Sequence, residues 1–109
     1  MKRCEVLLTE SAERDLEEIC DYVAGTDSPA KLEQLLRGLL ATTERLACFP
    51  ERGSFPKELL ALGIREYRQT FFKAFRVIYR VVGRRVFIYL IVDGRRDMQS
   101  LLVRRLLGA

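Results

Sequence analysis

The chain has 109 residues, of which 49% are hydrophobic and 31% charged. This balance excludes an intrinsically disordered chain and predicts one globular domain, residues 1–109. There is no histidine, so the commonest general base and metal ligand at neutral pH is missing. Residues 1–63 hold 8 Lys and Arg against 12 Asp and Glu, whereas residues 64–109 hold 11 against 3. The basic second half favours a nucleic acid or an acidic protein as partner.

The three cysteines (Cys4, Cys20 and Cys48) lie far apart and lack metal-ligand spacing. They are typical of small buried side chains in a reducing cytosol. No apolar run is long enough to span a membrane, and the first ten residues turn acidic too soon for a signal peptide. We therefore expect a cytoplasmic protein with no membrane contact, no metal and no cofactor.

The first half of the chain predicts a strand and two helices. Cys4–Leu8 is a short apolar run, and Thr9 is a suitable cap for a helix that stops near Gly25. Ser28 and Pro29 mark the start of a second helix, which Pro50 ends. About four residues join the two helices, so we expect an antiparallel helical hairpin. Gly38 lies inside the second helix at a cost of about 1 kcal/mol relative to alanine, which close packing would explain.

The second half predicts a loop at Pro50–Pro56, a single helical turn, three strands and a terminal helix. The strands span about Ile64–Phe72, Phe75–Val82 and Arg85–Val92, and their short connections favour an antiparallel meander. The order β-α-α-β-β-β-α predicts an α+β fold in which the helical hairpin covers one face of a small sheet.

Arginines on the strands pose the main functional question. Strict alternation in the middle strand places Arg76, Ile78 and Arg80 on one face, and the other face would pack on the hairpin. If the first of these faces is open, the arginines line a basic concavity; otherwise they are solvated or pair with the acidic first helix. The candidate phosphate-binding or target-binding residues are Arg65, Arg68, Lys73, Arg76, Arg80, Arg95 and Arg96.

Four segments together resemble the RelE/ParE superfamily of toxins from type II toxin–antitoxin systems. They are "LTESAERDLEEICDYVA", "FPERGS", "FRVIYRV" and "VDGRRD". The resemblance covers essentially the whole chain. It implies a RelE/ParE-like fold and a bacterial toxin that a cognate antitoxin neutralises in a hetero-oligomeric complex.

The family divides into two branches with different targets. RelE-like members cleave mRNA on the ribosome, whereas ParE-like members inhibit DNA gyrase. RNA cleavage needs a proton acceptor, stabilisation of a charged phosphorane and a proton donor, and arginine serves only the second well. The resemblance makes Arg68, Arg76 and Arg96 (or Arg95) the catalytic candidates if the chain is a ribonuclease.

The proton-transfer half of a RelE-like site is not evident, because the chain has no histidine and no tyrosine after Tyr89. Leu101 or Leu102 stands near the place of the tyrosine expected in that branch. "VDGRRD" is closer to the turn of ParE-like chains, with Asp93 in place of a histidine. The sequence thus favours a ParE-like gyrase inhibitor, with a RelE-like ribosome-dependent endoribonuclease as the alternative.

The terminal helix supplies a second set of candidates. Leu101, Leu102 and Arg105 are predicted to contact the antitoxin or the target, although the apolar stripe of this helix fits a core or a dimer contact equally well. Asp97 is suited to cap the helix or to fix the preceding turn. A nucleic-acid-binding module without toxicity is a third hypothesis, but no recognition-helix pattern and no aromatic–basic platform is evident in the sequence.

Overall fold

The computed structural model describes residues 3–26, 28–94 and 97–108. Its elements follow the predicted order, and their bounds are β1 (Glu5–Leu8), α1 (Glu10–Thr26), α2 (Pro29–Cys48), α3 (Lys57–Leu60), β2 (Arg68–Phe72), β3 (Phe75–Val82), β4 (Arg85–Asp93) and α4 (Met98–Leu107). The α+β prediction is confirmed, and β3 has the predicted bounds. β2 is shorter than predicted, because residues 64–67 lead into the strand without joining it.

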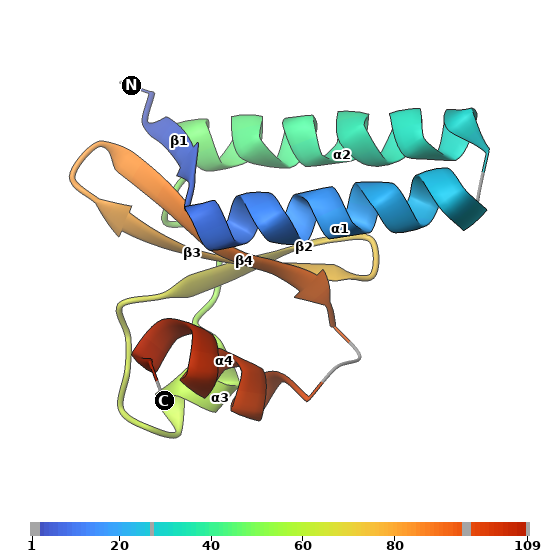
Figure 1. Cartoon of the computed structure of the whole chain (residues 1–109). Helices are drawn as coiled ribbons and strands as arrows, with labels where there is room; N and C mark the ends of the chain where they lie inside the picture. Colours follow the sequence, from blue (N-terminus) through green and yellow to red (C-terminus); the bar gives the residue numbers. More distant parts are fainter. Residues whose placement is uncertain (1–2, 27, 95–96, 109) are drawn as a thin grey trace.

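The four strands form one mixed sheet in the order β1-β4-β3-β2 (Figure 1). The meander β2-β3-β4 is antiparallel, as predicted, and β1 joins it in parallel with Glu5 opposite Arg85 and Leu8 opposite Ile88. The N-terminal strand therefore pairs with the last strand of the chain. Lys73 and Gly83 adopt positive φ angles of 52° and 62° in the two hairpin turns, where glycine is the residue that does so without strain.

The helical hairpin starts and stops at the predicted signals. Thr9 Oγ1 accepts a hydrogen bond from the backbone of Ala12 at 3.2 Å, and the Ser28 side chain accepts one from Lys31 at 3.4 Å. These side chains satisfy backbone N–H groups that the first turn of a helix leaves free. α1 and α2 then cover one face of the sheet, with Ala12 and Leu46 packed on Val77, Ile88 and neighbouring residues.

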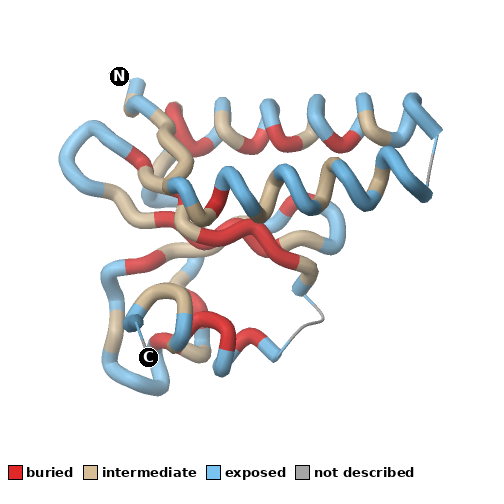
Figure 2. Tube along the Cα trace, viewed as in Figure 1, coloured by how far each residue is buried: buried red, intermediate tan, exposed pale blue. Residues whose placement is uncertain are grey.

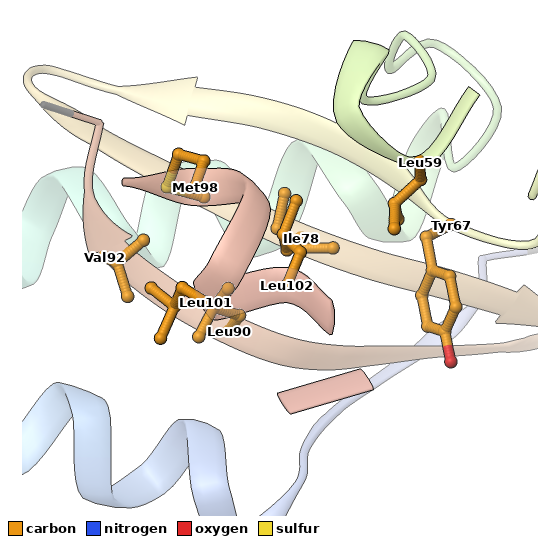
Figure 3. Packing of buried hydrophobic residues seen from close by; sticks show 8 residues of the cluster. All are labelled: Leu59, Tyr67, Ile78, Leu90, Val92, Met98, Leu101 and Leu102. Carbon is orange, nitrogen blue, oxygen red and sulfur yellow. The ribbon is translucent and has the colours of Figure 1, made fainter. Parts of the chain in front are cut away.

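The opposite face of the sheet is covered as well, which rules out the alternative of an open face. α3 and α4 lie across it, so that the sheet is sandwiched between two helical layers and its central strands are the most buried part of the chain (Figures 1 and 2). Leu59 of α3 and Met98, Leu101 and Leu102 of α4 pack on Ile78 (Figure 3). Each of these side chains is at most 5% exposed. The apolar stripe of the terminal helix therefore belongs to the core.

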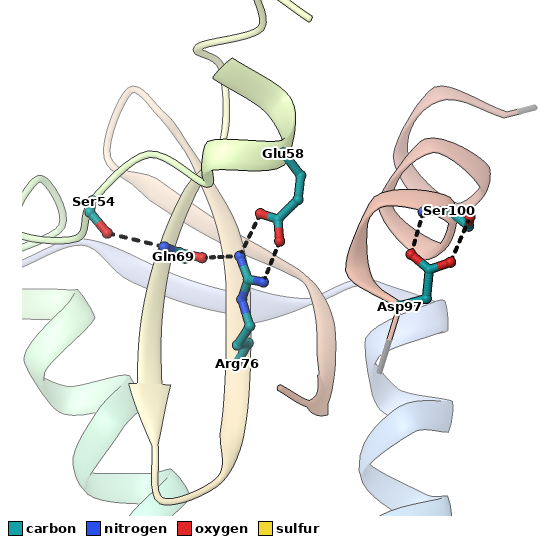
Figure 4. Close-up of polar contacts among 6 residues, drawn as sticks. All are labelled: Ser54, Glu58, Gln69, Arg76, Asp97 and Ser100. Carbon is teal, nitrogen blue, oxygen red and sulfur yellow. Dashed lines mark hydrogen bonds and ion pairs between the residues drawn. The ribbon is translucent and has the colours of Figure 1, made fainter. Parts of the chain in front are cut away.

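Asp97 caps α4, as one of its two predicted roles requires. Its carboxylate accepts hydrogen bonds from the Ser100 backbone at 3.3 Å and from the Ser100 hydroxyl at 3.0 Å (Figure 4). Within the described parts of the chain, no helix is long and apolar enough to cross a membrane.

Gly38 is explained by packing against the sheet rather than against the neighbouring helix. A Cβ atom built on Gly38 would lie 1.9 Å from Cε2 of Phe72, a residue of β2 that is 9% exposed. The phenyl ring thus occupies the space that any side chain at position 38 would need, and glycine lets α2 sit directly on the edge strand.

Candidate functional site

Of the seven cations predicted to form one basic surface, the five in the described part of the chain lie at three separate places. Arg68 lies where β2 begins, opposite Tyr79, and Lys73 lies in the turn beyond Phe72 at the other end of that strand. Arg65 and Arg80 join Arg68 in one groove. Arg76 is buried between these ends, and the predictions for Arg95 and Arg96 lie outside the described residues.

Arg76 is held in a buried polar network under α3. Its Nη1 and Nη2 atoms donate to the two carboxylate oxygens of Glu58 at 2.8 and 3.0 Å, and Nη2 also donates to Oε1 of Gln69. Gln69 in turn donates to the Ser54 hydroxyl at 3.3 Å (Figure 4). Arg76 is only 7% exposed, and its partner is Glu58 of α3. None of the three alternatives from the sequence (a basic concavity, solvation or a pair with the first helix) describes Arg76.

The ion pair gives Arg76 a structural role. The hydrogen bond from Arg76 is the largest cause that holds the pKa of the Glu58 carboxyl below its usual range. Both terminal nitrogens of Arg76 already donate within the chain, so a phosphate could bind there only if the pair with Glu58 opened. Its predicted catalytic role finds no support in this geometry.

The loop after α2 is fixed by Tyr79. The phenol donates to the carbonyl of Pro50 at 2.8 Å and accepts from the backbone N–H of Gly53 at 3.1 Å. Position 53 must be glycine, because a Cβ atom would lie 2.3 Å from the Tyr79 hydroxyl and 2.5 Å from the carbonyl of Gln69. Burial raises the pKa of Tyr79. The loop is therefore anchored on the sheet and presents its side chains from a rigid base.

The loop supplies the phenylalanine rings of two arginine–phenylalanine stacks. Arg68 lies over the ring of Phe55, 4.5 Å from its centre, and Arg65 approaches the same ring at 6.0 Å. Arg52 lies over Phe49 at 5.1 Å. Arginine over an aromatic face is a favourable electrostatic contact that also fixes the plane of the guanidinium group.

The two stacks share loop 49–55, although Phe49 and Arg52 border one hollow and Phe55 and Arg68 border another. Nη1 of Arg68 donates to the carbonyls of Glu51 and Gly53, at 3.0 and 2.9 Å, which are the residues on either side of Arg52. Arg80 completes a groove of about 410 Å³ next to Phe55, with Glu51 and Glu66 also on its lining. We call Phe49, Arg52, Phe55, Arg65, Arg68 and Arg80 the arginine–phenylalanine face.

The three candidate residues of the terminal helix all contact other parts of the same chain. Leu101 and Leu102 are 5% and 0% exposed, so they present almost no surface. Arg105 forms a bidentate ion pair with Asp15 of α1, with N–O distances of 2.8 and 3.1 Å. Asp15 also accepts from the backbone N–H of Ile91, on the part of β4 that extends beyond β1. Their contact with an antitoxin stays a prediction, and contact through Leu101 or Leu102 would require α4 to move.

An apolar groove lies between the helical hairpin and the sheet. It encloses about 190 Å³ and is lined by residues that include Leu8, Leu16, Leu36, Leu40 and Ile88. Leu36 and Leu40 are 44% and 64% exposed, which is unusual for neighbouring leucines on one helix. A second hollow begins at Leu16 and carries acidic side chains of α1, namely Glu13, Glu17 and Asp21. The groove therefore has an apolar floor and an acidic flank.

Comparison with known proteins decides the family. The family model described as "ParE toxin of type II toxin-antitoxin system, parDE" matches residues 6–98. This chain belongs to the ParE toxin family. A solved structure titled "Chromosomal ParDE TA system from P. aeruginosa" has the same fold, with a TM-score of 0.67 and 18% sequence identity. The match covers 84% of this chain and 96% of that one. The comparison with curated proteins returned no match.

Sequence reasoning missed several residues of this ParE-family toxin. Glu58 gave no signal, because its partner Arg76 is 18 positions away and both lie in segments of ordinary composition. The predicted elements place Phe49 at the end of the second helix and Phe55 in the loop Pro50–Pro56, with no sign that either stacks with an arginine, because that stacking depends on the anchored loop. The motif "FPERGS" in hindsight carries one complete stack, Phe49 with Arg52. In the described ranges 3–26, 28–94 and 97–108, no three Cys, Asp or Glu side chains could hold a metal ion.

Proposed function

We propose that this toxin arrests growth by inhibiting DNA gyrase through surface contacts, in the cytoplasm where gyrase works. The observation that carries the proposal is the match to the ParE family model over residues 6–98, since gyrase inhibition is the role expected of the ParE-like branch. A toxin of a type II system acts with a cognate antitoxin, and the complex with it would keep this toxin silent.

The state of the candidate catalytic groups supports this choice over RNA cleavage. Both terminal nitrogens of Arg76 are committed to Glu58 and Gln69, and one of Arg68 is committed to the backbone of loop 49–55. Burial raises the pKa of both Tyr67 and Tyr79, so neither supplies a phenolate base near neutral pH. The described residues thus offer arginines for phosphate, while neither of these tyrosines is suited to accept a proton and the chain has no histidine.

Purified toxin is expected to inhibit supercoiling by gyrase and to trap cleaved DNA, and an equimolar amount of antitoxin should reverse both effects. The assay is a plasmid-supercoiling reaction analysed for linear product. Primer extension on mRNA from induced cells serves as the second readout. Normal gyrase activity together with codon-specific mRNA cuts would contradict the proposal and favour the RelE-like alternative.

Deletion of the chain after Gly94 is not a suitable variant for this experiment. It would remove Met98, Leu101 and Leu102 from the core cluster, and loss of each such side chain alone costs about 2–5 kcal/mol. A loss of toxicity would then report unfolding. Full-length protein with its α4 helix intact is therefore required.

The apolar groove is the site that we propose for the antitoxin. An amphipathic segment with an apolar side and flanking Lys or Arg residues would match both the leucine floor and the acidic flank of Glu13, Glu17 and Asp21. Covering Leu36 and Leu40 would also remove the most exposed apolar side chains of α2 from water.

Leu40→Asp should weaken the toxin–antitoxin complex by at least roughly 10-fold, because an uncompensated carboxylate would be buried in an apolar contact. Isothermal titration of the variant with antitoxin from the neighbouring reading frame measures this effect. Leu62→Asp is the matched control, since Leu62 is 49% exposed and lies outside the groove. Equal losses in both variants, or no loss at Leu40, would place the antitoxin elsewhere.

A further inference from the structure

The arginine–phenylalanine face combines exposed cations with aromatic rings, a chemistry that suits more than a contact with a protein. Its four arginines come from loop 49–55, from the segment before β2, and from β2 and β3. Three of them lie against phenyl rings at 4.5 to 6.0 Å, and the loop below is tied to Tyr79 on both sides of Arg52. The fold brings these residues together from distant positions in the sequence, so no single linear motif contains the whole site.

We propose that this face binds a single nucleic-acid strand. The groove is lined by three arginines (Arg65, Arg68 and Arg80) against two glutamates (Glu51 and Glu66), and Arg52 on the same loop adds a fourth cation, so that the face carries net positive charge. Arginine binds phosphate bidentately, and exposed bases stack on guanidinium planes. The groove volume of about 410 Å³ falls within the range of roughly 300–1,000 Å³ found for ligand sites, which is enough for one nucleotide to enter.

The flat guanidinium groups favour a nucleic acid over an acidic peptide. Both ligands would meet the positive charge, but only a nucleic acid has planar bases that use a fixed guanidinium plane while its phosphates pair with the neighbouring cations. A single strand is favoured over a duplex, since the bases of a duplex are stacked on each other and cannot reach Arg68 beside Phe55. DNA and RNA share this chemistry, and the experiment separates them.

Binding is measured by fluorescence anisotropy with a short labelled DNA strand, the same RNA strand and the DNA duplex, at salt concentrations between about 50 and 200 mM. The complete toxin should bind both single strands more tightly than the duplex. Arg52→Ala with Arg65→Ala should weaken binding roughly 10-fold at the lowest salt. It should also reduce the slope of log K against log salt by about 1.4, since each phosphate contact of a single strand contributes about 0.7.

Two further variants separate the proposal from simple charge attraction. Arg52→Lys with Arg65→Lys keeps the charge but removes the planes, so it should retain the salt slope and lose affinity for the natural strand but not for an abasic one. Arg14→Ala with Arg37→Ala removes two exposed arginines of the helical hairpin and should leave binding within about 2-fold. All four side chains are exposed, so the fold should survive in each variant.

Any of four results would overturn the proposal, and the first three concern the single strand. They are a lack of saturable binding at the lowest salt, an equal loss in the Arg14/Arg37 control, and displacement of the strand by polyglutamate at matched charge concentration, which would identify an acidic-peptide site. Tighter binding of the duplex would also contradict a single-strand site. The reaction contains no gyrase, so these outcomes are independent of the supercoiling assay that tests the proposed function.

Discussion

Glu58→Ala is expected to lower the free energy of unfolding by about 3–5 kcal/mol, because it leaves the Arg76 guanidinium charged, buried and without its carboxylate. The effect should far exceed that of Glu33→Ala, which breaks an exposed pair with Arg37 and should change stability by less than about 1 kcal/mol. Urea denaturation of the natural chain and of the two variants measures both changes in the free energy of unfolding.

The double variant Glu58→Leu with Arg76→Met should recover most of the loss. Buried ion pairs replaced by apolar side chains of similar volume are often neutral or more stable, since two desolvated charges are removed together. Gln69 would keep its hydrogen bond to Ser54. If the double variant is as unstable as Glu58→Ala, or if Glu58→Ala itself costs less than about 1 kcal/mol, the network is not the anchor of α3.

The same pair predicts a loss of stability in acid. Arg76 holds the pKa of Glu58 below the ordinary carboxyl value of about 4.3. The contribution of the pair is therefore fully present above that value and is lost as the pH falls through the lowered pKa of the folded state. Glu58→Gln should show a flatter decline in stability below about pH 4 than the natural chain, measured by urea midpoints at each pH.

Gly38→Ala should destabilise the protein by about 1–3 kcal/mol, although alanine is the better helix former by about 1 kcal/mol. The added methyl group would lie 1.9 Å from the ring of Phe72, which is confined in the cluster with Leu35 and Leu39. The ring or α2 must therefore shift. Thermal unfolding followed by circular dichroism measures the change.

Gly25 provides the matched control, because it lies in the last turn of α1 with no atom within 4 Å of a built Cβ. Gly25→Ala should raise stability by a few tenths to about 1 kcal/mol through helix propensity alone. Phe72→Leu should relieve part of the penalty of Gly38→Ala, so the two changes should be non-additive. Stabilisation by Gly38→Ala would show that the ring moves aside freely.

Local signals in the sequence predicted most of the elements, because each depends on neighbouring residues. Ser28 and Pro29 define the start of α2, and period-two alternation defines β3. The sequence did not predict that α3 and α4 cover the second face of the sheet, because that contact joins residues far apart in the chain. Leu101 and Leu102 have the spacing of an apolar helix face, and spacing alone cannot say whether that face meets a partner or the chain's own sheet.

The candidate site was predictable only in part. Sequence analysis found the arginines of the strands, but the same residue type serves two purposes here, as a buried ion pair at Arg76 and as an exposed stack at Arg68. What separates them is a carboxylate from α3 in one case and a phenyl ring from loop 49–55 in the other. These partners are 13 or more positions away from the arginines, so only the folded chain reveals them.

The pairing of β1 with β4 joins Glu5 to Arg85, so during synthesis β1 has no partner until the last strand of the sheet has been made. At a translation rate of about 5–20 residues per second, roughly 4–16 s separate the two strands. Until then Val6 and Leu8 have no sheet to pack in, and the sheet cannot close. A native fold can thus appear only after β4 has been synthesised, and until then the nascent chain exposes apolar residues of β1 and is prone to aggregation.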